Sequence, residues 1–168
     1  MLKLCVLLCL LQLLLVTATA GTSVPLQDQQ HYPNCTAIPR SECTALYDLY
    51  YATNGDTWLS TQGFFGTPQV CHWPCIYCNE DGTHVTDIYL YQNNQTGFLP
   101  PSIGNFTMLR KLFIFDNFIT GQLPSTIGNL YHLESLYINN NRFSGSIPES
   151  IGKLQQLRFA VANRNGFS

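Results

Sequence analysis

Apolar residues recur with a fixed period along the second half of the chain. The pattern Leu-x-x-Leu-x-Ile occupies residues 109–114 and again 133–138, and units that begin at Gly97, Gly121 and Gly145 are spaced by 24 residues. Alternation over such a short stretch predicts a strand with one face turned inward. A period of this length predicts a solenoid whose coils each bury an apolar side against the next. The fold class that we predict is therefore an α/β repeat solenoid with parallel strands.

An asparagine column follows the predicted strands, at the point where the chain must turn. A buried amide side chain there can satisfy backbone groups that no sheet ladder reaches. The Gly-x-Leu/Ile-Pro step that comes next supplies a conformationally free turn and then a fixed φ, and Ile-Gly closes a short helical or 3₁₀ turn on the convex side. We predict a structural asparagine ladder formed by Asn93, Asn117, Asn141 and Asn165.

The region before the repeats is predicted to be a cap, because the first coil of a solenoid exposes an apolar end. Residues 41–53 carry apolar side chains at helical spacing and predict one short amphipathic helix, which Asn54-Gly55 ends. We predict, in chain order, a signal peptide at 1–20, a flexible leader at 21–40, the N-terminal cap at 41–84 and the repeats at 85–168, with a half-unit at 85–96 and full units at 97–120, 121–144 and 145–168.

The first residues have the pattern of a secretory signal peptide. Lys3 precedes an apolar run from Leu4 to Val16, and small residues from Thr17 to Ala20 provide the cleavage site. The apolar run is about 13 residues long, shorter than the roughly 20 that a membrane-spanning helix needs. We therefore predict a secreted, extracellular protein.

An extracellular route makes disulfides and N-glycans the expected modifications. Cleavage after Ala20 removes Cys5 and Cys9 from the seven cysteines, and the odd number that remains leaves at least one thiol unpaired or intermolecular. The sequence alone does not choose among the pairings. Three Asn-x-Thr sequons predict glycosylation at Asn34, Asn94 and Asn105.

Composition and charge narrow the classes of function. The 168 residues include 8 Lys and Arg against 10 Asp and Glu, and only 11% of all residues are charged. This balance gives no electrostatic reason to expect a nucleic-acid partner or a polybasic membrane contact. With 45% hydrophobic residues, the chain is not disordered throughout.

The full repeat consensus, Leu-x-x-Leu-x-Ile-x-x-Asn-x-Phe/Ile-x-Gly-x-Leu/Ile-Pro-x-x-Ile-Gly, resembles the plant-specific class of leucine-rich repeat. Upstream, residues 45–50, Asn-Gly-Asp-Thr-Trp at 54–58 and Cys-His-Trp-Pro-Cys-Ile-Tyr-Cys at 71–78 resemble the N-terminal cap of that family, in a form more like that of its protist relatives. The resemblance covers residues 41–168. It implies a right-handed solenoid with a parallel sheet on its concave face, an extracellular location, and a binding rather than a catalytic role.

The resemblance also bears on the cysteines. The family cap usually reads Cys-x-Trp-x-Gly-Val-x-Cys, so Cys71 and Cys78 match its paired positions and a disulfide between them is implied. Cys75 stands where the family has glycine, which is a departure from the pattern. We expect Cys35, Cys43 and Cys75 to share one further bond, with the pairing left open.

A zinc site is the alternative interpretation of the same cysteines, because Cys75-x-x-Cys78 lies close to Cys71, His72 and His84. The oxidising route and the lack of a second Cys-x-x-Cys argue against it. The sequence also contains no nucleophile motif, Gly-rich phosphate loop or His-Glu-x-x-His. We predict no metal, no cofactor and no enzymatic activity.

The remaining candidate for function is a surface. The resemblance implies that the residues between the inward Leu and Ile positions face the concave side, where two adjacent columns begin with aromatics. Exposed aromatics on a rigid sheet are typical of peptide and protein binding sites, whereas the alternative is that the rings only pack on one another. The candidate ligand-binding residues are Asp87, Tyr89, Tyr91, Lys111, Phe113, Phe115, Ser135, Tyr137, Asn139 and Phe159.

These patterns predict a secreted binding module that recognises a peptide or protein ligand in extracellular recognition, defence or signalling. One alternative is the ectodomain fragment of a receptor or receptor kinase. Only on this alternative do we expect an association with a membrane. Another, implied by the resemblance to short family members, is an inhibitor of secreted glycan-degrading enzymes. In the last repeat, Ala160 and Ala162 stand where the other repeats have Leu and Ile, so the interior of the last coil is less well filled. This indicates a truncated product, a less apolar exposed end, or end-to-end self-association with the coil of a partner.

Overall fold

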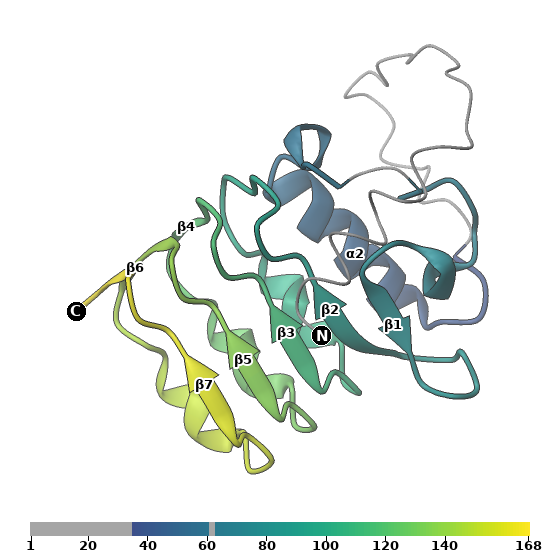
Figure 1. Cartoon of the computed structure of the whole chain (residues 1–168). Helices are drawn as coiled ribbons and strands as arrows, with labels where there is room; N and C mark the ends of the chain where they lie inside the picture. The colour runs from purple at the N-terminus through teal and green to yellow at the C-terminus, as the bar shows by residue number, and fades with distance from the viewer. Residues whose placement is uncertain (1–34, 61–62) are drawn as a thin grey trace.

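The structure of the protein is a computed structural model that describes residues 35–60 and 63–168. The predicted signal peptide, the first part of the predicted leader and the sequon residue Asn34 lie outside the described residues. What is described is a coil of stacked repeats with a cap at its first turn (Figure 1). The predicted fold class, a repeat solenoid with a parallel sheet and a helical cap, is confirmed.

The main sheet has one strand from each coil and one from the cap. Leu112 pairs with Ile88 on one side and with Leu136 on the other, so parallel neighbours are offset by one 24-residue repeat. Ile88, Leu112 and Leu136 are buried because the alternating pattern turns them inward. The strands are β1 (Ile76–Cys78), β2 (Val85–Tyr89), β3 (Lys111–Phe113), β5 (Ser135–Tyr137) and β7 (Phe159–Val161), in the sheet order β1-β2-β3-β5-β7.

Strand β1 belongs to the cap and is an addition to the four parallel strands expected from the sequence. It pairs antiparallel with β2, and Tyr77 lies opposite Asp87. Ile76 is buried against the core whereas Tyr77 is 44% exposed on the other face. Three residues are too few for a periodicity to be recognised, so only the pairing with β2 reveals this strand.

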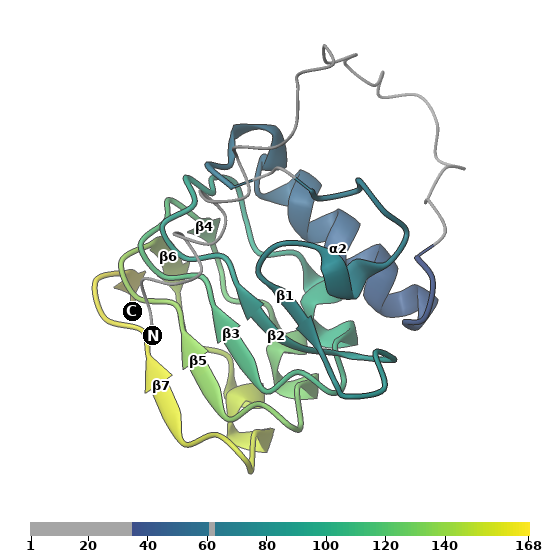
Figure 2. The same cartoon turned by 45° about the vertical axis from the view of Figure 1, so that its right-hand side comes forward.

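The side opposite the main sheet is built from 3₁₀ turns and a small second sheet (Figure 2). The turns η4 (Pro101–Asn105), η5 (Ser125–Asn129) and η6 (Glu149–Lys153) each follow a proline in the repeat. Between each main-sheet strand and the following 3₁₀ turn, the extended segments that run from the repeat asparagine to the next glycine pair in parallel with those of adjacent coils. They form a sheet that the sequence pattern did not predict, with strands β4 (Thr120–Gly121), β6 (Arg142–Gly145) and β8 (Gly166–Phe167).

The cap consists of a helix and an aromatic cluster. Helix α2 (Arg40–Ala52) begins and ends one residue before the predicted positions and buries Leu46 and Leu49 against the first coil. The short turns η2 (Gly55–Thr57) and η3 (Val70–His72) follow it. Trp58 and Trp73 are 5% and 3% exposed, so both are buried cap aromatics.

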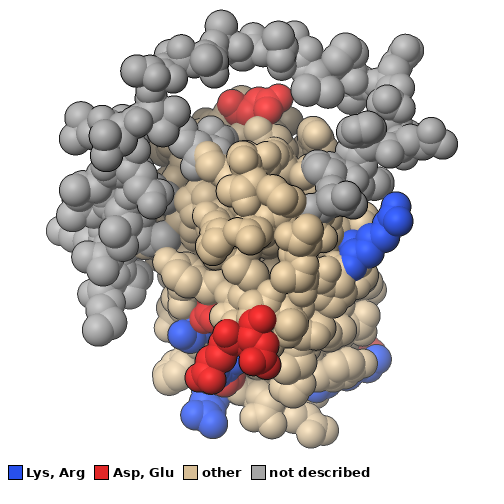
Figure 3. Space-filling view, turned by 90° about the vertical axis from the view of Figure 1, so that its right-hand side faces the viewer, with Lys and Arg blue, Asp and Glu red and all other residues tan. Residues whose placement is uncertain are grey.

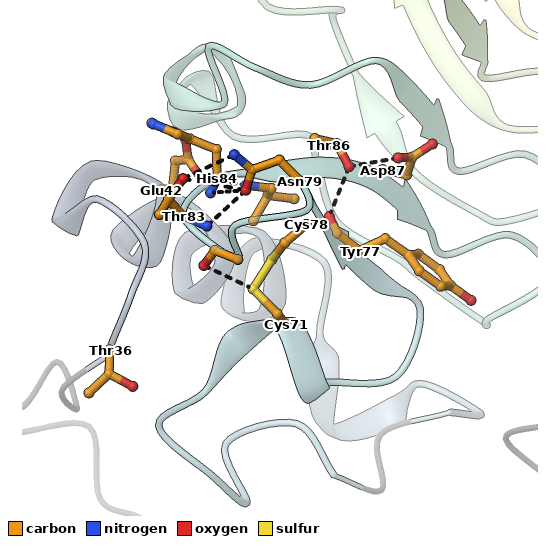
Figure 4. The surroundings of a disulfide bond; sticks show 12 residues. Thr36, Glu42, Cys71, Tyr77, Cys78, Asn79, Thr83, His84, Thr86 and Asp87 are labelled. Atoms are coloured by element: carbon orange, nitrogen blue, oxygen red, sulfur yellow. Dashed lines mark hydrogen bonds and ion pairs between the residues drawn. A yellow bond between two sulfur atoms is a disulfide. The ribbon is translucent and has the colours of Figure 1, made fainter.

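A buried carboxylate joins the cap helix to the first strand. Glu42 on α2 is 1% exposed, and its carboxylate accepts a hydrogen bond from the backbone N–H of Val85 at 2.8 Å. The other carboxylate oxygen lies 2.7 Å from Nδ1 of His84 (Figure 4). Because a buried carboxylate is costly without partners, these two contacts hold α2 and the start of β2 in one arrangement.

Two disulfides fasten the cap. One joins Cys71 to Cys78, the pairing that the family resemblance implies (Figure 4), and the other joins Cys35 to Cys43 on α2. The second bond fixes the end of the segment that the sequence assigns to the leader. Thr36 accordingly donates its backbone N–H to the carbonyl of Pro68 at 2.9 Å, so residues from Cys35 onward pack with the cap.

Asparagine side chains connect each coil to the one before it. The Oδ1 of Asn117 accepts the backbone N–H groups of Asn93 and Gln95 at 2.9 and 3.0 Å, and its Nδ2 donates to the carbonyls of Leu90 and Ile114. Asn141 and Asn165 bond their neighbouring coils in the same way. In the first coil, Oδ1 of Asn93 accepts the N–H of Ser60 from the cap.

Replacing Asn117 by Ala should lower the free energy of unfolding by about 1–3 kcal/mol, because buried backbone groups in two coils lose their partners. Denaturant unfolding measured by circular dichroism checks this value. Asn129→Ala is the matched control, since Asn129 is exposed at the end of η5. Equal stability of the two variants would contradict a structural role for the asparagine column.

Cys75 adopts the left-handed backbone conformation, with φ +64°, which explains why the family pattern has glycine there. The free energy of unfolding of Cys75→Gly should therefore equal or exceed that of the parent. Cys75→Val should be less stable than Cys75→Gly by about 1–2 kcal/mol, because a β-branched residue disfavours positive φ. Thermal unfolding checks the order, with Cys75→Ala to separate loss of the thiol from the backbone effect. A valine variant as stable as the glycine variant would contradict it.

Candidate ligand-binding face

Four aromatic side chains form a continuous row across the outward face of the main sheet. We call Tyr77, Tyr89, Phe113 and Tyr137 the aromatic row. Successive ring centroids lie 5.3, 5.0 and 4.6 Å apart, with the ring planes inclined by 57–67°. Parallel pairing places equivalent residues of adjacent coils side by side, which brings these rings into contact. Because the ring planes are inclined to one another, the outward surface of the row is uneven. Tyr89, Phe113 and Tyr137, which lie on the parallel strands, are half-buried.

A second pair of rings lies beside the row. Tyr91 and Phe115 stack with their planes 3° apart and their centroids at 4.8 Å. Tyr91 is only 8% exposed, so this ring contributes mainly to packing. Phe115 remains half-buried and contacts both Phe113 and Tyr137. The face thus combines mutual packing with exposed ring surface.

A charged group fixes Tyr89, the second ring of the row. Asp87 accepts a hydrogen bond from the Tyr89 hydroxyl at 3.1 Å and from the Thr86 hydroxyl at 2.8 Å, and it lies 3.2 Å from Nζ of Lys111. Burial raises the pKa of the Tyr89 hydroxyl, the charge of Asp87 raises it further, and Lys111 offsets part of this shift. Tyr89 is therefore held as a neutral hydroxyl in a defined orientation.

The other candidate residues lie at the margins of this face. Ser135 is only 9% exposed, whereas Phe159 is 57% exposed on β7. Asn139 is half-buried in the same column as Tyr91 and Phe115. Beyond it, Asp116 accepts hydrogen bonds from the side-chain amides of Gln92 and Asn140, which forms a polar border.

The sequence pattern does not reveal Tyr77, although this residue extends the row by one ring. Strand β1 has only three residues, Ile76–Cys78, which is too short for an alternating pattern to be recognised in the sequence. Because β1 is antiparallel and outside the 24-residue period, its position next to β2 follows only from the tertiary structure.

A groove of about 450 Å³ runs along the edge of the sheet where the strands begin. It reaches from the loop after β1 to the third full repeat, and Asp87, which lines it, also accepts the hydrogen bond from Tyr89 of the aromatic row. Arg110 and Glu134 form an ion pair in it, with 2.8 Å between Nε and Oε1. We call it the edge groove; its charged lining includes Glu80, Asp87, Arg110 and Glu134.

Comparison with known proteins identifies the repeats. The Leucine Rich Repeat family model matches residues 108–130 and 132–154. The PEPR1–AtPEP1 structure superposes with a TM-score of 0.66 at 25% identity, over 74% of this chain and 18% of that one. The chain therefore contains leucine-rich repeats, in a coil similar to those of plant receptors. The match to PEPR1 means that the chain spans less than a fifth of the length of that relative.

Other leucine-rich-repeat structures agree on the fold. The ectodomain of the receptor kinase SOBIR1 from Arabidopsis thaliana matches with a TM-score of 0.61 at 25% identity, over 76% of this chain and 70% of that one. The BIR3–SERK2 complex from the same plant has a TM-score of 0.50 at 20% identity, over 76% and 83% of the two chains, and supports the fold alone. No curated protein matches the sequence significantly.

The metal-ligand candidates are dispersed by the fold. Cys71 and Cys78 are joined as a disulfide, and His84 turns to Glu42. Within residues 35–60 and 63–168, no three His, Cys, Asp or Glu side chains converge as metal ligands. The helical part of the described chain also contains no segment long and apolar enough to cross a membrane.

Two of the three predicted glycosylation sites can be placed. Asn105 is exposed at the end of η4, and Thr107 of its sequon is exposed as well. Asn94 is half-buried in a turn with φ +57°, and its Nδ2 donates to the carbonyl of Thr57 at 3.0 Å. Asn105 is thus the more accessible of the two side chains, and it lies on the convex side.

The raised pKa of Tyr89 predicts a loss of stability at alkaline pH. Below the unfolded tyrosine pKa of about 10, the hydroxyl keeps its proton in both the folded and the unfolded state. Above this pH the unfolded chain releases the proton first. The free energy of unfolding therefore falls as the pH rises from the unfolded pKa through the folded pKa. Tyr89→Phe should show a shallower fall than the parent, measured by urea unfolding across this range. Tyr131→Phe is the control, because Tyr131 is exposed. Identical slopes for both variants would contradict the assignment.

Proposed function

We propose that this protein is a secreted leucine-rich-repeat binding module whose concave face recognises a short extended peptide. The aromatic row is the observation that carries the proposal. Its rings present both apolar surface and hydroxyl groups on a sheet that is already ordered, so binding costs little conformational entropy. Binding modules use such aromatic anchors as their main source of affinity.

The size of the face favours a peptide over a folded protein. Five strands about 4.8 Å apart span roughly 19 Å, and strands of three to five residues limit the face to a few hundred Å². A stable interface between folded proteins needs about 800 Å² per partner. An extended segment of a few residues, laid across the strands, matches the area available.

An extracellular location is part of the same proposal. The signal-peptide pattern and the two disulfides support it, since disulfides persist in oxidising compartments. The similarity to the PEPR1–AtPEP1 complex and to a receptor-kinase ectodomain supports a binding role rather than a catalytic one. No enzymatic activity is proposed for the chain.

A receptor ectodomain is the second candidate function, favoured by the match to the SOBIR1 ectodomain over 70% of that chain. On this hypothesis the concave face would contribute one part of a longer binding surface. Sequencing of the full-length transcript distinguishes the two functions, because only the receptor continues into further repeats or a membrane span.

Phe113→Ala should weaken peptide binding by about 1–3 kcal/mol while the fold persists, because the central ring of the row is lost. Peptides are obtained by selecting a phage-displayed random library on the secreted full-length protein, and their affinity is measured by isothermal titration calorimetry. Tyr137→Ala should act alike.

Tyr131→Ala provides the matched control, since this exposed aromatic lies in the loop between η5 and β5, outside the aromatic row. Circular dichroism establishes that each variant is folded. Unchanged affinity of folded Phe113→Ala and Tyr137→Ala proteins would mean that the row serves packing alone, and a failure to select any peptide would count against the proposed function.

A further inference from the structure

The edge groove gives the ligand of the concave face a charge requirement. Resting on the proposed function, we infer that the peptide carries a basic side chain, Lys or Arg, at the end that lies over the cap, where it pairs with Glu80. The inference combines three observations: the groove continues the aromatic row, its charges are paired except at the cap end, and the cap loop is held in place.

Continuity between row and groove comes from Asp87. Its carboxylate lines the groove and accepts the hydrogen bond of Tyr89, a member of the aromatic row. Glu80 and Asn79 extend the lining onto the cap loop, one strand beyond β2. A peptide that crosses the row toward the cap therefore reaches this end of the groove without leaving the protein surface.

The charges of the groove are unevenly compensated. Asp87 lies 3.2 Å from Lys111, and Glu134 lies 2.8 Å from Arg110. Glu80 is exposed and, within the described part of the chain, forms no ion pair; its neighbour Asp81 is exposed too. Figure 3 shows acidic side chains gathered low on the cap side, with basic ones at the margin of the cluster.

The opposite end of the groove offers no unpaired acidic side chain. It is lined by Glu134, which is already paired with Arg110, and by the neutral Gln156. The charge of Arg158, in the last repeat, also acts on Glu134. A basic side chain of the peptide is therefore favoured at the cap end, beside Glu80, over the far end, and this preference sets the direction of the bound peptide.

The cap loop presents Glu80 on a fixed backbone. Oδ1 of Asn79 accepts the N–H groups of Thr83 and His84 at 2.8 and 3.0 Å, and Nδ2 of Asn79 donates to the Thr83 hydroxyl (Figure 4). The disulfide at Cys78 anchors the loop immediately before it. Little ordering of the loop is left for the binding step, so the charge contact is preorganised.

The test compares Glu80→Lys with Glu149→Lys on the secreted full-length protein. Both change the net charge equally, but Glu149 lies on η6 of the convex side. Peptides selected from a phage-displayed random library on the parent protein should be enriched in Lys or Arg at one end. Their affinity should fall about five- to tenfold with Glu80→Lys and stay unchanged with Glu149→Lys, and the difference should shrink at high salt.

The outcomes separate this inference from the proposed function. Selected peptides that lose affinity with Phe113→Ala but show no basic preference, or no response to Glu80→Lys, overturn the inference and leave the binding face intact. Peptides that ignore Phe113→Ala, or a library that yields no binder, overturn both. Equal losses with Glu80→Lys and Glu149→Lys would reduce the effect to net charge and also overturn the inference.

Discussion

Every coil of this protein is completed by hydrogen bonds to the coil beside it. The parallel strands β3, β5 and β7 have only three residues each, too few to persist alone. Asn117 shows how the gap is closed: one amide group accepts from the previous coil and donates to carbonyls of both coils. Because buried backbone groups must be paired, no coil can form its turn without a neighbour, and stability is a property of the stack.

The cap follows from the same constraint at the first coil. No repeat precedes Asn93, and a cap residue, Ser60, supplies the N–H that its Oδ1 accepts. Strand β1 covers the free edge of β2 in antiparallel pairing, and Glu42 satisfies the N–H of Val85. The cap therefore does more than cover apolar side chains, since it provides some of the hydrogen bonds that a preceding coil would have provided. The two disulfides hold these donors and acceptors in place.

The aromatic row is a geometric consequence of stacking. Residues one repeat apart are brought side by side, so aromatics at equivalent positions must touch, and their centroids lie at 5.0 and 4.6 Å in the parallel part of the sheet. Packing and binding are thus two uses of the same rings. Contact with neighbours holds each ring in position, and the half-buried faces remain available to a ligand.

Local and periodic features were predictable from the sequence. The period of the coil, the inward Leu and Ile positions and the columns of outward aromatics all repeat along the chain, and the cap helix was placed to within one residue. These features depend on alternation and helical spacing within one segment, and on the recurrence of that segment along the chain. The family resemblance added the pairing of Cys71 with Cys78.

Contacts between distant segments were decided only by the tertiary structure. The second sheet, the antiparallel strand β1, the bond between Cys35 and Cys43 and the contact of Glu42 with His84 join segments without a shared pattern. The same holds for exposure: Tyr91 and Phe159 both occupy outward columns, yet one is 8% and the other 57% exposed. Sequence determines which face a residue takes along its own strand, whereas the neighbours that cover or leave that face depend on how the whole chain is stacked.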